Sequence, residues 1–320
     1  MRGAGRRIGA AILAVVAILG LGGCSTRAAE WTDQTYAIAG GSPTGVYYDY
    51  GGRIGAALSD ALDITVQVEQ TAGSLDNLRR VGSGQALLGF AQADAAADAV
   101  MGTGAFDQPL PVVAVARLYD EYLHVVVRGE SDIDSIADLA GSTISLGARD
   151  SGVNVIATRV LDAAGVGIDT IQDPQLGLSD SISAMRSGEI DGFFWVGGLP
   201  TPGIEELASN QPVRLLPIER TWVTAINERY ANAYRTADLP VGTYGLTQSA
   251  PTMAVPNYLV TASSTPDAVV RDILVTLFDA RQEMAAEVPA AALLDRRQAV
   301  FTSPVELHPG AVDFYRGMRE

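Results

Sequence analysis

Residues 83–90 read Ser-Gly-Gln-Ala-Leu-Leu-Gly-Phe, and residues 187–194 read Ser-Gly-Glu-Ile-Asp-Gly-Phe-Phe. Each segment follows a stretch with the apolar spacing of an amphipathic helix, and each contains a glycine turn and a short apolar run typical of a buried strand. Each run then leads into a loop, Gln92-Ala93-Asp94 in the first case and Trp195-Val196-Gly197-Gly198 in the second. This similarity between the two segments predicts two lobes of similar construction.

The rest of the chain alternates short β-rich runs with amphipathic stretches, which is the pattern of an α/β fold. Ligands of open α/β sheets bind beyond the carboxyl ends of strands, and a cleft between two domains is a common ligand site. We therefore expect two α/β lobes that face one another across a ligand cleft. The expected strands are residues 35–39, 64–68, 87–91, 112–117, 123–128, 143–146, 192–195 and 258–262. The expected helices are residues 46–60, 74–81, 135–139, 151–164, 179–187, 204–208 and 266–280, with a short helix capped by Asp94.

Three loops that join a strand to a helix, residues 40–48, 71–77 and 147–154, are rich in glycine and hydroxyl side chains. Glycine lets the backbone approach a ligand closely, and a helix N-terminus presents N–H groups and positive potential to an anion. The first loop is neither a P-loop, since lysine is absent, nor a dinucleotide fingerprint, since its glycines do not fit. It could instead be a structural turn, and Ser74 could simply cap its own helix. Three such loops split between two lobes favour a site for a small anion.

The N-terminus has the pattern of an export signal. Arg2, Arg6 and Arg7 precede an apolar run at residues 8–21, which is too short to span a bilayer but suits a signal peptide. Leu21-Gly22-Gly23-Cys24 then resembles a bacterial lipobox, although a plain signal peptide with an incidental cysteine is the alternative. Because Cys24 is the chain's single cysteine, we expect residues 1–23 to be a signal peptide, Cys24 to carry the lipid, and residues 24–30 to form a tether. The mature protein would then be anchored to the outer face of the cell membrane.

The charge of the chain narrows the classes of partner. The formal net charge is −15, and residues 1–23 hold three Arg and no acid, so the mature chain would carry −18. Such a charge argues against nucleic acid or an anionic membrane surface as a partner. All 22 basic residues are arginine, which excludes lysine Schiff bases, P-loop lysines and lysine general bases. We expect a monomer that uses no cofactor and no metal.

Residues suited to catalysis are few. His124 lies in an apolar run and His308 precedes Pro309, so each is more typical of a structural histidine than of a base. The sequence contains no Gly-x-Ser-x-Gly elbow and no His-Glu-x-x-His motif. Asp132, Asp134 and Asp138 are typical of a solvated turn and helix start. These features indicate a protein that is not an enzyme.

Eight motifs, in order along nearly the whole mature chain, resemble the TAXI family of solute receptors, which serve TRAP-type transporters. The matching motifs are residues 40–48, 71–78, 92–94, 124–128, 138–141, 187–192, 240–244 and 307–311. The resemblance implies a two-lobed periplasmic-binding-protein fold of the second type, with two chain crossings between the lobes. It also implies binding of an acidic amino acid or related carboxylate, and delivery of that solute to a transporter driven by an ion gradient.

The resemblance also implies the residues of the cleft. The first lobe would contribute Gly41, Thr44, Tyr47, Ser74, Asn77, Gln92 and Asp94, and the second would contribute Ser151, Gly152, Ser179, Trp195 and Gly198. From position alone, Trp195 could equally be core filler. The sequence departs from the family pattern in the third loop, where Arg149 and Asp150 precede Ser151 and Val153 stands where Thr is usual. Arg149 could pair with a ligand carboxylate or with Asp150.

The expected lobe boundaries follow from the similarity of residues 83–90 and 187–194, and from two points where the chain could cross between lobes, near His124 and near Val255. We expect residues 31–123 and 254–320 to form the first lobe and residues 124–253 to form the second. The expected function is capture of a glutamate-like amino acid or a dicarboxylate for a TRAP-type transporter. Two alternatives remain: a ligand-sensing lipoprotein that reports to a membrane sensor, and an exported hydrolase with a hydroxyl nucleophile.

Overall fold

The computed structural model describes residues 31–32, 34–230 and 232–317. The expected signal peptide, the lipidation site Cys24 and the tether at residues 24–30 therefore lie outside the described residues. Within the described ranges, none of the helices is both long and apolar enough to cross a membrane.

In the described residues, one mixed sheet of nine strands has the order β2-β1-β3-β9-β4-β6-β5, with β7 beside β4 and β8 beside β9. The pairs β1–β2, β1–β3 and β5–β6 are parallel. Parallel neighbours need crossover connections, and α1, α2 and α5 occupy those connections here. The strands are β1 Thr35–Ala39, β2 Thr65–Glu69, β3 Leu88–Gln92, β4 Val112–Arg128, β5 Ile144–Ser145, β6 Gly192–Gly197, β7 Val213–Leu215, β8 Arg235–Leu239 and β9 Ala250–Ala262.

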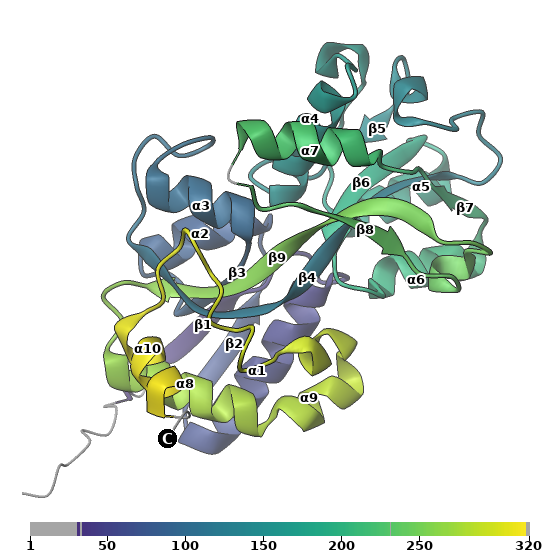
Figure 1. The fold of residues 1–320 in the computed structure, drawn as a ribbon. Helices are drawn as coiled ribbons and strands as arrows, with labels where there is room; N and C mark the ends of the chain where they lie inside the picture. Colours follow the sequence, from purple (N-terminus) through teal and green to yellow (C-terminus); the bar gives the residue numbers. More distant parts are fainter. Residues whose placement is uncertain (1–30, 33, 231, 318–320) are drawn as a thin grey trace, which may run out of the picture. The chain divides into compact units, whose positions relative to one another are not determined.

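The two longest strands, β4 and β9, connect the two halves of the protein (Figure 1). They pair antiparallel from Val112 opposite Ala262 to Tyr122 opposite Ala254, with irregular register between Ala114 and Tyr119. The prediction of separate strands at 112–117 and 123–128 is wrong, because β4 is continuous through that interval. The expected crossings near His124 and Val255 fall inside these two strands, so the sheet runs from one half to the other.

Helices cover both halves of the sheet (Figure 1). Helices α1, α2, α3, α8, α9 and α10 belong to the half with β1–β3, and α4 to α7 belong to the half with β5 and β6. The α-helices are α1 Val46–Leu62, α2 Ser74–Gly82, α3 Ala93–Met101, α4 Gly152–Ala163, α5 Leu178–Ser187, α6 Pro202–Asn210, α7 Arg220–Arg229, α8 Asp267–Asp279, α9 Arg281–Glu287 and α10 Pro309–Gly317. The 3₁₀ helices are η1 Ile136–Leu139, η2 Ile168–Thr170, η3 Thr243–Gly245 and η4 Pro289–Leu293.

Most of the other expected elements are present, within a few residues at each end, but the expected strand at 258–262 is the end of the longer β9, which starts at Ala250. Residues 135–139 form the 3₁₀ helix η1. The sequence pattern did not indicate β7, α7, β8, α9, α10 or the 3₁₀ helices η2, η3 and η4. The cap positions also differ from expectation. Gly73, not Ser74, precedes α2, and Gln92, not Asp94, precedes α3. The side chains of Ser74 and Asp94 are thereby free for other contacts.

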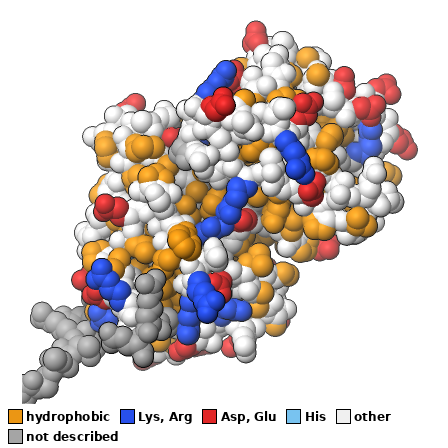
Figure 2. Space-filling view, viewed as in Figure 1, with side chains coloured by type: hydrophobic (Ala, Val, Ile, Leu, Met, Phe, Trp, Pro, Cys, Tyr) orange, Lys and Arg blue, Asp and Glu red, His pale blue; other side chains and the backbone are white. Residues whose placement is uncertain are grey.

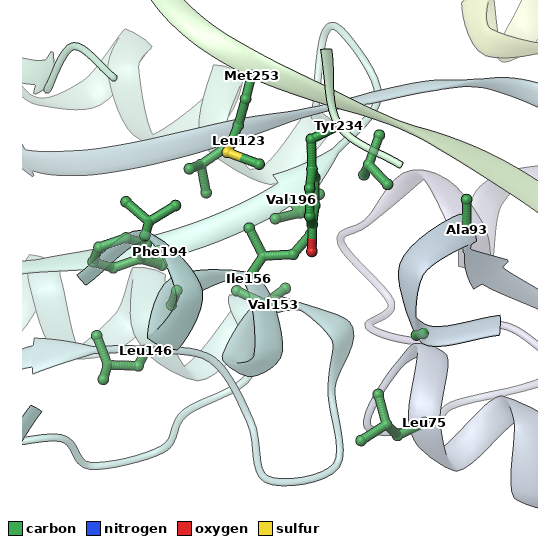
Figure 3. Close-up of a cluster of buried hydrophobic side chains, with 14 of the residues drawn as sticks. Leu75, Ala93, Leu123, Leu146, Val153, Ile156, Phe194, Val196, Tyr234 and Met253 are labelled. Carbon is green, nitrogen blue, oxygen red and sulfur yellow. The ribbon is translucent and has the colours of Figure 1, made fainter. Parts of the chain in front are cut away.

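The largest buried cluster takes side chains from both halves. Leu75 and Ala93 come from the first half, whereas Val153 and Ile156 on α4 pack near Phe194 on β6 in the second (Figure 3). Fully burying a large aliphatic or aromatic side chain stabilises a fold by about 1.5–3 kcal/mol. A core shared in this way holds the two halves together, and residues from Trp31 onward accordingly form one compact unit.

Side chains of both charge signs are interspersed over the face seen in Figure 2. Several form local ion pairs, including Arg235 with Asp120 at 3.2 Å and Arg186 with Glu206 at 2.9 Å. Exposed pairs of this kind contribute about 0–1 kcal/mol each. The stability of the fold therefore rests on the shared core rather than on these pairs.

Candidate functional site

A cavity of about 90 Å³ lies between the two halves, at the point where four helices begin. A water-sized group needs roughly 10–15 Å³ of such space, so the cavity has room for a small ligand. Helices α1 and α2 approach from the first half, and helices α4 and α5 approach from the second. The wall residues are Gly41, Ser42, Gly45, Val46, Tyr47, Gln70, Thr71, Ala72, Gly73, Ser74, Gln92, Glu121, Gly147, Ala148, Ser151, Gly152, Val153, Leu176, Gly177, Leu178, Ser179, Asp180, Phe194, Trp195 and Val196.

Glycines allow the helix starts to come this close. Gly73 precedes α2 with φ of 123°, a conformation that L side chains rarely adopt, and a Cβ there would lie 3.4 Å from the Cβ of Ser151. A Cβ at Gly152 would lie 1.9 Å from the Oε1 of Gln92 and 3.0 Å from the Oγ of Ser74. The first turn of α4 therefore packs directly on the first half only because residue 152 is glycine.

Hydroxyl groups bridge the two halves at one side of the cavity. The Oγ of Ser179 lies 3.0 Å from the Oγ1 of Thr44 and 3.2 Å from the Oγ of Ser42. On another side, the backbone N–H of Asp76 donates to the carbonyl of Asp150 at 3.2 Å, and Arg79 pairs with the Asp150 carboxylate at 2.7 Å. The cleft is thus closed around the cavity.

A buried hydrogen-bond network forms the floor of the cavity. The hydroxyl of Tyr47 donates to Glu121 at 2.9 Å, and the Nε2 of Gln92 donates to Glu121 at 3.1 Å. The hydroxyl of Tyr119 donates to the other Glu121 oxygen at 3.1 Å. Ser74 accepts from the backbone N–H of Gln92 at 3.2 Å, so its own hydrogen remains available to Tyr47 or to a ligand. All three side chains that donate to Glu121 are neutral.

Glu121 was not among the site residues expected from the sequence. It is 1% exposed, although it lies in the wall of the cavity. Burial raises the pKa of Glu121 to about 8, against the three hydrogen bonds that favour the charged form. Glu121 lies inside β4, in the interval where the sequence pattern predicted a break between two strands.

Two buried polar atoms next to this network are among those that lack partners in the described residues. The Oε1 of Gln92 and the Oδ1 of Asn257 accept no hydrogen bond, although Gln92 is 2% exposed and Asn257 is fully buried. An unsatisfied buried acceptor costs about 1–3 kcal/mol. Since Gln92 lies in the cavity wall, its free oxygen is a group that a ligand or an ordered water could satisfy.

The structure brings eight of the thirteen expected ligand residues to the cavity wall. They come from both halves and from each of the three predicted loops. Trp195 is among them, and its Nε1 donates to the Oγ1 of Thr201 at 3.1 Å. The eight residues are Gly41, Tyr47, Ser74, Gln92, Ser151, Gly152, Ser179 and Trp195.

The other five lie off the wall. Thr44 reaches the site through hydrogen bonds to the wall residues Ser42 and Ser179. Asn77 is fully buried and holds the second loop in place, because its Nδ2 donates to the Phe90 carbonyl at 2.8 Å and its Oδ1 accepts from Thr71. Gly198 packs against Val46 and Tyr119, where a Cβ would lie 3.2 Å from each.

Arg149 and Asp94, the last two of the five, also lie outside the cavity wall. Arg149 is exposed, and the carboxylate of Asp150 pairs with Arg79 rather than with it. Asp94 is fully buried and pairs with Arg159 of α4 at 3.0 Å, while the hydroxyl of Tyr234 donates to it at 2.6 Å. Asp94 therefore joins the first half to the second.

The two histidines are structural. His124 is fully buried, its Nε2 lies 3.2 Å from the Tyr244 hydroxyl, and burial lowers its pKa to about 4, so it is neutral. The Nδ1 of His308 accepts from the Gly310 N–H, and its Nε2 lies 2.8 Å from the Thr265 carbonyl oxygen. In the described part of the chain, no group of three His, Cys, Asp or Glu residues is placed to hold a metal ion.

The fold and this closed inter-lobe cavity define the class of two-lobed α/β proteins to which periplasmic binding proteins of the second type belong. A family model described as the NMT1-like family matches residues 38–318. The chain therefore belongs to the NMT1-like family.

Solved structures of low sequence identity share the fold. "Structure of a periplasmic transporter" has a TM-score of 0.56 at 15% identity, covering 91% of this chain and 94% of that one. The alkanesulfonate-binding protein SsuA from Xanthomonas axonopodis pv. citri, bound to MOPS, has a TM-score of 0.52 at 13% identity, covering 90% and 85%. An ancestral arginine-binding protein bound to arginine has a TM-score of 0.52 at 12% identity, covering 80% and 99%. At these identities the comparisons establish the fold alone.

Proposed function

We propose that this protein is an extracytoplasmic solute-binding protein that captures a small carboxylate and presents it to a membrane transporter. The observation that carries the proposal is the meeting of four helix N-termini at one closed cavity. Each N-terminus contributes backbone N–H groups and partial positive charge, a combination suited to an anion. The family membership and the fold of the similar structures support the same class of function.

The chemistry of the wall supports a carboxylate held by neutral donors. Among the described wall residues there is no arginine, and the chain contains no lysine. The available donors include backbone N–H groups and the hydroxyls of Ser74, Ser151 and Ser179. A hydrogen bond to a charged group contributes about 1.5–3 kcal/mol, so a few such bonds suffice for a tight complex.

The finer assignment is a TAXI-type receptor that serves a TRAP-type transporter. It rests on the eight motifs of the sequence, three of which, at residues 40–48, 71–78 and 92–94, contribute to the cavity wall. The ligand would be a glutamate-like amino acid or a dicarboxylate. The proposed lobes are residues 31–123 with 254–320 and residues 124–253, opening and closing about β4 and β9.

Membrane attachment through Cys24 completes the proposal. The Leu-Gly-Gly-Cys boundary and the absence of any other cysteine support it. Two acyl chains anchor a protein stably where one does not. Cys24→Ala should abolish lipid labelling in cells and move the protein out of the membrane fraction; undiminished labelling of that variant would contradict the anchor.

A thermal-shift screen of the mature protein tests the ligand class. A ligand at about 100 times its dissociation constant stabilises the folded state by about 2.7 kcal/mol. L-glutamate, L-aspartate or succinate should raise the melting temperature, whereas L-arginine and glucose should not. Stabilisation by the sugar or the cation alone would contradict the proposed ligand class.

A further inference from the structure

Glu121 is a buried acid with no cationic partner. Its three hydrogen-bond donors are Tyr47, Gln92 and Tyr119, all neutral. Within the described residues, no arginine or histidine forms an ion pair with it. A carboxylate removed from water without a cation is costly, and such a group takes up a proton instead.

Among the described residues, the side chains around Glu121 carry no positive charge. Helix α1 contributes Tyr47, and the strand β9 contributes Asn257, which donates to Tyr47. Helix α3 contributes Asp94, whose charge raises the pKa of Glu121 further. From the second half, the titratable group in the cavity wall is Asp180, and it is acidic too.

The hydrogen-bond geometry accommodates the neutral acid without rearrangement. Tyr119 makes its hydroxyl hydrogen bond to Glu121 and to no other described side chain. Its hydrogen can therefore rotate away, so that a protonated Glu121 donates to the Tyr119 oxygen over the same 3.1 Å. The floor of the cavity thus has one arrangement of atoms for both charge states of Glu121.

Charge at Glu121 decides what the cavity can hold. A ligand carboxylate at the helix starts would share a small, enclosed space with Glu121, since Ser74 and Gln92 belong both to the wall and to the Glu121 network. Two carboxylates in one such site cannot both stay ionised at low cost. A neutral acid removes that repulsion.

We propose that Glu121 is the specificity-determining residue of the cavity, and that an anionic solute binds only when Glu121 carries a proton. The inference rests on the proposed function, since it assumes that the solute is an anion. The proton comes from solvent: the ionised receptor, one proton and the anion combine to give the neutral-acid complex. Ionised Glu121 rejects the anion and favours release.

Affinity for the anion should fall as pH rises. Burial raises the pKa of Glu121 to about 8, so the receptor is ready to bind at pH 7 and loses that readiness as pH rises through that value. For one linked proton, affinity at pH 9 should be about tenfold weaker than at pH 7. At pH 8, binding should take up about half a proton per ligand.

The experiment measures dissociation constants of the mature protein by calorimetry at pH 7, 8 and 9. The probe is whichever of L-glutamate, L-aspartate and succinate binds most tightly at pH 7. Wild type should lose about tenfold between pH 7 and 9, and Glu121→Gln, which mimics the neutral acid, should bind without that loss. The ratio of the two proteins' affinities cancels any titration of the probe itself. Asp180→Asn is the matched control, because it removes the other wall acid and should keep the pH dependence of wild type.

Each outcome decides between the claims. A constant wild-type affinity across pH 7–9, or the same decline in Glu121→Gln, would overturn the role of Glu121 and leave the receptor function standing. Failure of all three anions to bind at pH 7 would instead overturn the proposed function, and this inference with it. Proton uptake, read from wild type in two buffers of different ionisation enthalpy, gives a second measurement that needs no variant.

A ligand-free measurement checks the protonation of Glu121 directly. A raised pKa means that the unfolded chain releases this proton at lower pH than the folded protein does, so wild type loses stability relative to Glu121→Gln as pH rises from about 5 to about 8. The melting temperature of Glu121→Gln minus that of wild type should therefore increase across this window. A difference that stays constant with pH would mean that Glu121 is ionised throughout, and would overturn the inference.

Discussion

Two carboxyl groups are buried where the halves of the molecule meet, and they differ in their partners. Asp94 is paired with Arg159, which also pairs with Asp98 at 2.8 Å. Glu121 has only neutral donors. Burial raises the pKa of both acids, but for Asp94 the charge of Arg159 opposes the rise. Burial alone therefore does not assign a role: the acid with a cation joins the halves, whereas the acid without one lines the cavity.

Removing the cation should produce the largest effect. Arg159→Ala leaves Asp94 buried without its cationic partner, and breaking a buried pair in this way costs about 3–5 kcal/mol. Urea unfolding at pH 7 would measure the loss. Arg186→Ala is the matched control, because Arg186 and Glu206 are exposed and their pair should contribute about 0–1 kcal/mol. Equal losses in the two variants would mean that the Asp94 pair contributes no more than a surface pair.

The second prediction separates the cavity wall from its support. Ser74→Ala should weaken binding of the carboxylate about tenfold or more, because a hydrogen bond to a charged group contributes about 1.5–3 kcal/mol. Asn77→Ala should instead lower the free energy of unfolding by about 1–3 kcal/mol, because the buried carbonyl of Phe90 loses its donor. Calorimetry and urea unfolding on both variants distinguish the two effects. If Ser74→Ala binds as wild type does, Ser74 is no ligand residue.

The third prediction concerns the approach of the two halves. Gly152→Ala would place a Cβ 1.9 Å from the Oε1 of Gln92, so either the Gln92 side chain or α4 must shift. We expect an affinity loss of about tenfold, or about 1.4 kcal/mol. At Gly177, which precedes α5 in the same wall, a Cβ would meet nothing within 4 Å, so Gly177→Ala should lose far less. Similar losses in both variants would contradict a role for the close contact at Gly152.

The smallest expected effect is a change in the fluorescence of Trp195 when a ligand binds. Trp195 lies in the cavity wall and packs against Gly45 at the start of α1. A Cβ added at Gly45 would lie 3.1 Å from the Trp195 ring. A bound ligand should therefore change its emission. Trp195→Phe should abolish the ligand-dependent change, whereas Trp222→Phe should preserve it. A signal that persists without Trp195 would place the change elsewhere in the protein.

The sequence allowed much of the fold to be predicted because apolar periodicity is strong at the elements around the cavity. The strand at Thr35–Ala39 and the helix starting at Val46 were predicted with those ends. The loops at residues 40–48, 71–77 and 147–154 were expected to gather, and they line one cavity, since strand ends gather at one edge of a sheet. The family resemblance supplied the rest of the eight wall residues.

The failures at Glu121, Asn77 and Asp94 share a physical cause, which is polar side chains in buried positions. Glutamate is almost never fully buried without a partner, so Asp120 and Glu121 made β4 look like two strands, and Glu121 was missed. The family resemblance assigned Asn77 and Asp94 to the cleft, but both side chains are buried off the cavity wall in contacts with Phe90 and Arg159. Only tertiary packing reveals which polar groups face the ligand.

The proposed site holds a carboxylate at the converging helix starts by backbone N–H groups and hydroxyls. A crystal structure of the mature protein with the tightest-binding carboxylate would show whether it does. We expect a carboxylate within hydrogen-bonding distance of the starts of α2 and α4, at Gly73, Ser74, Ser151 and Gly152, with Gln92 and Glu121 beneath it. A carboxylate bound outside this cavity, or one held by an arginine side chain, would contradict it.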